Sequence, residues 1–179
     1  MIKLVVGLGN PGAQYADTRH NAGAWYLRRL AQHYQVLLKP VSRFNALIGQ
    51  QFDQQPSLIL FIPTTFMNLS GNAIAKFANF HRILPEEILV AHDDLDLPVG
   101  AIKFKQGGGH AGHNGLKDII HQLAGCRDFY RLRLGIGHPG SKALVVNYVL
   151  SRPSPSECQQ LDQAIVQAVE ATNALIEKS

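Results

Sequence analysis

The chain has 179 residues, of which 46% are hydrophobic and 17% are charged, and its formal net charge at pH 7 is +4. This composition excludes a wholly disordered chain, and the length is sufficient for a single domain over residues 1–179 with a core of its own. The excess of basic residues favours an anionic partner such as a nucleic acid, although many basic proteins bind none.

Short apolar runs alternate along the chain with residues at helical spacing. The first run, "IKLVVGL", is rich in β-branched residues, which is typical of a strand buried on both faces. In chain order, the pattern predicts a strand over 2–8, a helix over 21–34, strands over 46–52 and 57–63, a helix over 69–82, strands over 87–93 and 101–106, a helix over 115–125, a strand over 129–137 and a helix over 154–178. Ser154 or Ser156 is the expected N-cap of the last helix.

This alternation predicts an α/β fold, with helices on both sides of a sheet in a three-layer α/β/α sandwich. In "AIKFKQ", residues 101–106, apolar and basic residues alternate. One face of this strand is therefore expected to be buried and the other to carry Lys103 and Lys105. Such a strand favours a mixed sheet over an all-parallel one.

The two cysteines, Cys126 and Cys158, stand in no spacing typical of a metal site and cannot build a disulfide framework. The N-terminal apolar run breaks at glycines before it could form a secretory signal. No apolar run approaches the roughly 20 residues that span a bilayer. The sequence therefore predicts a cytoplasmic protein with reduced thiols and no membrane partner.

The motif "GLGNPG", residues 7–12, follows the first strand and has some likeness to a dinucleotide-binding loop. The third glycine of that loop is missing, and Pro11-Gly12 forms a β-turn before a helix can begin, so nucleotide binding is disfavoured. In open α/β sheets, ligands bind beyond the carboxyl ends of the strands. Asn10 lies at such an end.

His20 lies in "TRHNAG", directly before the first predicted helix, and "LVAHDDLDLP" brings Asp93 and Asp94 to the end of another strand. We expect these carboxylates at the same sheet edge as Asn10. A carboxylate that accepts a hydrogen bond from Nδ1–H of a histidine leaves Nε2 free to take a proton from water. The residues form a candidate general-base pair, in which the pattern alone does not decide between Asp93 and Asp94.

Other interpretations of these polar residues stay open. The segments "HDDLD" and "HAGH" could supply metal ligands, but the chain has no HExxH spacing, and His110 and His113 stand three apart in a glycine-rich loop. Asn68 and Asn114 each precede a predicted helix, so each could cap it or bind a ligand.

Positive charge is concentrated on two predicted strands. Lys103 and Lys105 alternate on one, Arg131 and Arg133 alternate on the other, and Lys142 follows the "GIGHPGSK" turn. Residues spaced in this way can hold phosphates, although alternating charges usually mark a solvated face of a sheet.

Together, five motifs resemble the bacterial peptidyl-tRNA hydrolase family: "GLGNPGAQYADTRHNAG", "PTTFMNLSG", "AHDDLDLPVG", "KFKQGGGHAGHNGL" and "YRLRLGIGHPG". They run from about Lys3 to Leu150 in the order and spacing of the family. The resemblance implies a monomeric esterase without metal or other cofactor, built on a twisted mixed sheet. Such an enzyme cleaves the ester between a peptide, or an N-blocked amino acid, and the 3′-terminal ribose of tRNA, and so recycles tRNA from prematurely released peptidyl-tRNA.

The resemblance also implies roles for individual residues. His20 would be the general base that activates water, held by Asp93, and Asn10 would position substrate and water beside it. The residues expected to bind the peptide and the 3′ end are Tyr15, Met67, Asn68, His113 and Asn114. The residues expected to bind the 5′-phosphate and acceptor stem of tRNA are Lys105 and Arg133, with Lys103 and Lys142 nearby.

Two other classes of function are alternatives to this enzyme. An RNA-binding protein could keep the fold without catalysis, as family relatives in plant organelles that assist RNA splicing do, and a metal-dependent amidohydrolase would lose activity with a chelator. The complete set of Asn10, His20, Asn68, Asp93 and Asn114 favours the enzyme. Family members commonly carry a longer C-terminal helix with basic residues, whereas this sequence ends at "NALIEKS".

Overall fold

The structure is a computed structural model that describes residues 1–53 and 57–178. Its strands are β1 (Leu4–Gly7), β2 (Lys39–Val41), β3 (Ala46–Gln51), β4 (Leu58–Pro63), β5 (Ile88–Asp94), β6 (Ile102–Gln106) and β7 (Tyr130–Gly135). Its α-helices are α1 (Ala22–His33), α2 (Ser70–His81), α3 (Asn114–Gln122), α4 (Val145–Val149) and α5 (Pro155–Glu177).

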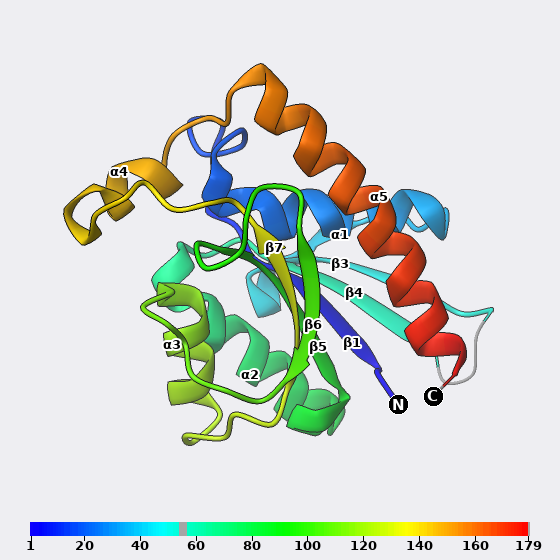
Figure 1. Ribbon diagram of the computed structural model, residues 1–179. Coiled ribbons are helices and arrows are strands. Elements are labelled where there is room, and N and C mark those ends of the chain that lie inside the picture. Colours follow the sequence, from blue (N-terminus) through cyan, green and yellow to red (C-terminus); the bar gives the residue numbers. More distant parts are fainter. Residues whose placement is uncertain (54–56, 179) are drawn as a thin grey trace.

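The strands form one seven-stranded sheet in the order β2-β3-β4-β1-β5-β7-β6 (Figure 1). β4, β1, β5 and β7 are parallel to one another, and β2, β3 and β6 run antiparallel to their neighbours. The mixed sheet expected from residues 101–106 is therefore confirmed. The carboxyl ends of the four parallel strands meet at one edge of the sheet, where the polar motifs follow β1, β4 and β5.

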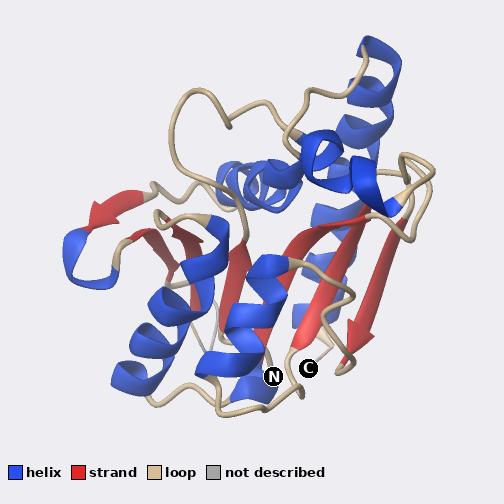
Figure 2. Cartoon of the chain, turned by 90° about the vertical axis from the view of Figure 1, so that its left-hand side faces the viewer, coloured by secondary structure: helices blue, strands red, loops and turns tan. Residues whose placement is uncertain are grey.

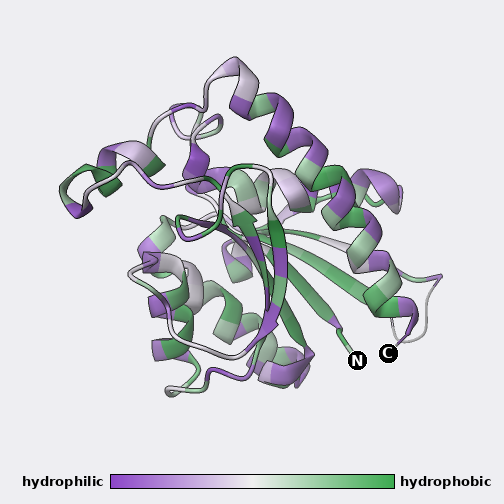
Figure 3. Ribbon diagram, viewed as in Figure 1, coloured by the Kyte–Doolittle hydropathy of each residue, from purple (hydrophilic) through white to green (hydrophobic). Residues whose placement is uncertain are grey.

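Helices cover both faces of the sheet, as the three-layer prediction requires (Figures 1 and 2). Because successive strand residues point to opposite faces, Leu89 and Ala91 of β5 pack beneath α1 and α5, whereas Val90 packs beneath α2 and α3. In Figure 3, β1 and β4 are hydrophobic along their length, while α5 alternates between hydrophobic and hydrophilic residues, as expected for a helix with one buried face.

Each predicted strand and helix is present, with its ends shifted by a few residues. Ser154 is the N-cap of α5: its Oγ accepts the N–H of Glu157 at 3.2 Å, and the Glu157 carboxylate accepts the N–H of Ser154 at 3.0 Å. The sequence did not reveal β2 and α4, because strands and helices this short show no measurable periodicity. No helix in the described part of the chain is long and apolar enough to cross a membrane.

Helix α1 approaches the sheet closely at Gly23. A Cβ atom at this position would lie 2.2 Å from the carbonyl oxygen of Ala91 and 2.8 Å from the backbone nitrogen of Leu8, so only glycine fits. At the next residue, the N–H of Ala24 donates a hydrogen bond to the carbonyl oxygen of Leu8 at 3.0 Å. This close packing places the turn before α1, which carries His20, against the end of β5.

We expect Gly23→Ala to lower the free energy of unfolding by about 1–3 kcal/mol, because the added methyl group overpacks a contact between backbones. Urea denaturation measures the effect. Gly109→Ala is the control, since a Cβ there meets only Nη1 of Arg127, at 3.9 Å, and it should change stability by less than about 0.5 kcal/mol. Equal free energies of unfolding for the two variants would show that α1 can move away from the sheet without loss of stability.

Candidate active site

A cleft of about 880 Å³ opens at the carboxyl edge of the parallel strands. The residues expected from the sequence that line it are Asn10, His20, Met67, Asn68, Asp93, Lys105, His113, Asn114, Arg133 and Lys142. Tyr15 and Lys103 are not among its lining residues. The Tyr15 ring instead contacts Phe66, which does line the cleft, edge-on with 6.3 Å between ring centres. Lys103 lies directly opposite Arg133 in the β6–β7 register.

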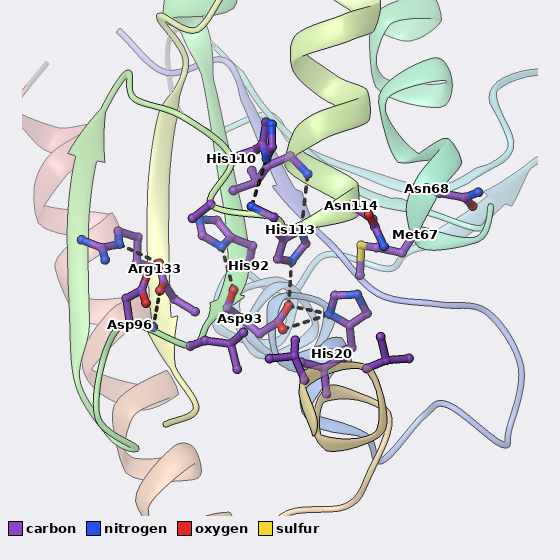
Figure 4. Close-up of a pocket in the computed structure, with 18 of the residues that line it drawn as sticks. His20, Met67, Asn68, His92, Asp93, Asp96, His110, His113, Asn114 and Arg133 are labelled. Atoms are coloured by element: carbon purple, nitrogen blue, oxygen red, sulfur yellow. Dashed lines mark hydrogen bonds and ion pairs between the residues drawn. The ribbon is translucent and has the colours of Figure 1, made fainter. Parts of the chain in front are cut away.

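His20 and Asp93 form a buried pair in this cleft (Figure 4). Nδ1 of His20 lies 2.9 and 3.0 Å from the two carboxylate oxygens of Asp93. Since a carboxylate only accepts, Nδ1 carries the proton, and Nε2 keeps a free lone pair. Asp94 points to the opposite face of β5, where it accepts a hydrogen bond from Arg133 at 2.7 Å. Of the two acidic residues, Asp93 is therefore the one that holds His20.

His113 is a second partner of Asp93. Its Nε2 lies 2.8 Å from Oδ1 of Asp93, and its Nδ1 accepts the N–H groups of Gly115 at 3.1 Å and Leu116 at 3.3 Å. His113 is thus the N-cap of α3 and ties this helix to the carboxylate of Asp93. Asn114 is the first residue of the helix and does not cap it, so its exposed side chain is available to a ligand in the cleft.

The hydrogen bonds of this cluster disfavour metal binding. His20, Asp93 and His113 are the described residues whose possible ligand atoms come within 4.8 Å of one another. Nδ1 of His113 accepts two backbone N–H groups, so the single proton of a neutral imidazole must be on Nε2. The nitrogens of His20 and His113 that face Asp93 are then both proton donors, and neither offers a lone pair to a metal ion.

His20 and Asp93 shift each other's pKa. Burial lowers the pKa of His20, but the charge and hydrogen bond of Asp93 outweigh burial and raise this pKa above the ordinary 6.5. Burial likewise raises the pKa of Asp93, but His20 and His113 bring it well below its usual range. Next to them, burial lowers the pKa of His92 to about 4. Around neutral pH, Asp93 is therefore ionised and His92 is neutral.

Amide side chains line the cleft on the side of β1 and β4. Oδ1 of Asn10 accepts the N–H of Met67 at 2.7 Å, so its amide Nδ2 is the group left to donate into the cleft. Asn21, which sequence reasoning assigned to no role in the site, holds Asn10 in place. Its side chain accepts the Asn10 N–H at 2.9 Å and donates to the Asn10 carbonyl at 3.0 Å. Figure 4 shows Asn114 beside Met67, with Asn68 extending further from His20.

Basic residues line the side of β6 and β7. Lys105 and Lys142 are exposed, whereas Arg131 is buried and Arg133 is half-buried. Arg133 uses Nε to bind Asp94, so one carboxylate offsets part of the positive charge that the sequence pattern predicted. Figure 4 places Arg133 on one side of Asp93, and Met67, Asn68 and Asn114 on the other.

Sequence reasoning missed the apolar wall of the cleft, which α4 and its neighbours provide. The apolar residues concerned are Phe66, Leu95, Val145, Val146, Val149 and Leu150. Arg19, adjacent to His20, fixes this wall: its guanidinium donates to the carbonyl of Tyr148 at 3.2 Å and pairs with Glu157 at 3.2 Å. No periodic signal in the sequence could reveal a contact between residues so far apart in the chain.

Several known proteins are similar to this chain in sequence and in fold. A family model described as peptidyl-tRNA hydrolase matches residues 4–179. A peptidyl-tRNA hydrolase from Histophilus somni is 54% identical over 177 residues, which are 99% of this chain and 91% of that protein. One from Shewanella putrefaciens is 56% identical over 178 residues, with the same shares covered.

Among solved structures, peptidyl-tRNA hydrolase from Acinetobacter baumannii superposes with a TM-score of 0.94 at 44% identity, over 99% of this chain and 89% of that one. A complex of peptidyl-tRNA hydrolase with N-propanol also gives a TM-score of 0.94, at 45% identity, over 98% of this chain and 89% of that one. Sequence and fold agree with the motifs around the cleft, and the chain belongs to the peptidyl-tRNA hydrolase family.

Proposed function

We propose that this cleft hydrolyses the ester between a peptide, or an N-blocked amino acid, and the 3′-terminal ribose of tRNA, with His20 as the general base. The observation that carries this proposal is the buried His20–Asp93 pair, with Nδ1 of His20 2.9 Å from the carboxylate. Nε2 is then the one basic nitrogen that this pair offers to a water molecule in the cleft. We infer that a single domain, acting as a monomer, suffices, because one chain supplies the entire site.

The proposed reaction needs one activated water and no covalent intermediate. Nε2 of His20 takes a proton as the water oxygen attacks the ester carbonyl, and the ionised Asp93 stabilises the resulting imidazolium. When the bond between the carbonyl carbon and the ribose oxygen breaks, the imidazolium returns the proton to that oxygen. The products are the peptide acid and tRNA with a free 3′-terminal ribose.

Asn10 is placed to stabilise the negative charge that develops on the carbonyl oxygen. Its Oδ1 is occupied by the N–H of Met67, so Nδ2 is the group left to donate to the substrate. A donor held in this way needs no reorganisation when the charge appears. Asn68 and Asn114 would bind the peptide main chain, and neutral amides recognise a backbone whatever its side chains, which suits an enzyme that accepts many peptides.

The two sides of the cleft match the two halves of the substrate. Lys105, Arg133 and Lys142 would face the phosphates of the tRNA acceptor stem, and Lys103 adds charge just outside the cleft. The apolar residues of the cleft, those of α4 and Phe66 among them, would hold the peptide, and Tyr15 supports Phe66 from outside. The catalytic pair lies between the two sides, where the ester joins RNA to peptide.

We expect His20→Ala to lower turnover by at least about 10²-fold, because the variant lacks the base but keeps the binding residues. Release of tRNA from an N-acetyl-aminoacyl-tRNA in the presence of EDTA measures this, and tRNA affinity should be unchanged. His121→Ala, an exposed histidine of α3 outside the cleft, is the control. Near-normal turnover in His20→Ala would rule out this mechanism, and loss of wild-type activity with EDTA would favour a metal-dependent hydrolase.

The pH profile tests the pairing with Asp93. A general base works when neutral, so kcat/KM should rise with pH, with a midpoint above 6.5 because Asp93 raises the pKa of His20. In Asp93→Asn the neutral amide no longer favours the imidazolium, so the midpoint should move to lower pH, and kcat should fall by about 10²-fold or more. Rates are corrected for spontaneous ester hydrolysis. An identical midpoint in both proteins would contradict the assignment.

Arg133→Ala should weaken tRNA binding and make it less sensitive to salt. Each lost phosphate contact reduces the slope of log affinity against log salt concentration by about one unit. Binding of deacylated tRNA, titrated at several salt concentrations, gives the slope. If the slope were the same as in the wild type, Arg133 would not contact a phosphate.

A further inference from the structure

Arg131 is a buried cation without an anionic partner. Its side chain is 3% exposed, and no ion pair of the described residues includes it. Its guanidinium lies 4.5 Å from the centre of the Phe129 ring, and burial with the nearby Arg127 and Arg133 lowers its pKa. Burying a charge without a counter-charge costs free energy, which hydrogen bonds from the guanidinium must offset.

The guanidinium of Arg131 holds the backbone of the glycine-rich loop. It donates to the carbonyl oxygen of Gly108 at 2.6 Å and to that of Gly109. In a trans peptide the C=O and the following N–H point in opposite directions. The N–H groups of Gly109 and His110 therefore point away from Arg131.

These two N–H groups are free to bind a ligand. Neither donates to an acceptor within residues 1–53 or 57–178, and both Gly109 and His110 line the cleft. Successive N–H groups that point the same way form an anion-binding concavity. The positive charge behind their carbonyls polarises both peptides and makes the N–H groups stronger donors.

Two more cations flank this turn. A Cβ at Gly108 would lie 2.7 Å from Nζ of Lys105, so the ammonium group rests against the turn. At the next residue, Nη1 of Arg127 is 3.9 Å from the position of a Cβ at Gly109. Arg127 is exposed and has no acidic partner in the described part of the chain. The turn thus combines two backbone donors with three positive charges.

We propose that the Gly108–His110 turn binds an RNA phosphate, with the N–H groups of Gly109 and His110 as donors, Arg127 and Lys105 as counter-charges, and Arg131 as the positioning residue that builds the site. This rests on the proposed function, because the RNA half of the substrate supplies the phosphate. Contacts to phosphates do not depend on the base sequence, which suits an enzyme that acts on tRNAs in general. The phosphate is the 5′-terminal one or one within the acceptor stem.

Titration with inorganic phosphate, followed by NMR, tests the turn directly. The amide proton resonances of Gly109 and His110 should move downfield in phosphate but not in chloride at equal ionic strength. Arg131→Lys keeps a charge but loses the fork that holds two carbonyls, so the same resonances should no longer respond in a folded protein. Unresponsive amides in the wild type would overturn the proposal.

The exposed Arg127 provides a test that does not depend on the buried residue. Arg127→Gln should weaken binding of deacylated tRNA by about fivefold and reduce the salt slope. The matched control is Arg28→Gln, an exposed arginine on α1, on the other face of the sheet, which should bind as the wild type does. If both variants behave alike in affinity and slope, the turn does not bind RNA.

A tRNA without its 5′-phosphate distinguishes between the two candidate ligands, the 5′-terminal phosphate and a phosphate within the acceptor stem. The Arg127→Gln effect disappears on this RNA if the turn holds the terminal phosphate, and it persists if the turn holds an internal one. Neither deacylated tRNA nor inorganic phosphate contains the ester. Failure of this proposal would therefore leave the His20 mechanism standing, and the two failures are distinguished because turnover reports on His20 and binding of deacylated tRNA reports on the turn.

Discussion

One buried carboxylate organises the site. Asp93 accepts a hydrogen bond from His20 on one side and from His113 on the other, at 2.9 and 2.8 Å. The first bond selects the tautomer of the candidate base, and the second anchors the helix whose N-terminus His113 caps. A carboxylate shared in this way stays ionised because both neighbours favour its charge. The position of α3 and the basicity of His20 thus depend on the same group.

The glycine-rich loop between β6 and α3 is held in position by two contacts, one of which involves Asp93. Arg131 holds the carbonyls at its start, and the His113–Asp93 bond holds its end. Its glycines let the backbone turn tightly at positive φ, as at Gly107 and Gly112, so that both anchors can be reached within a few residues. The loop is pinned at both ends, and the proposed phosphate contacts therefore keep a set distance from the proposed base.

Much of the fold and of the candidate site followed from local sequence patterns. Alternating Lys103 and Lys105 predicted a mixed sheet, and polar residues after apolar runs predicted which strand ends meet. The missing parts depend on contacts that no local pattern encodes. The pattern alone did not separate Asp93 from Asp94, because the two differ only in which face of β5 they occupy. Asn21, at the N-cap position of α1, binds Asn10 instead of capping the helix, which only the folded turn reveals.

The order of groups along the sheet edge follows from strand order, not from chain order. β7 and β6 carry the cations, β5 carries Asp93 and stands next, and β1 and β4 carry the amides beyond it. The parallel strands bring the carboxyl ends of β1, β4 and β5 to one edge whatever their distance in sequence, and β7 and β6 lie next to β5 with cations along their length, so cations, base and amides follow one another across the sheet. Peptidyl-tRNA has the same linear order of phosphate, ester and peptide. In the function we propose, a cleft with this order would bind both halves of such a substrate and leave only the ester beside His20.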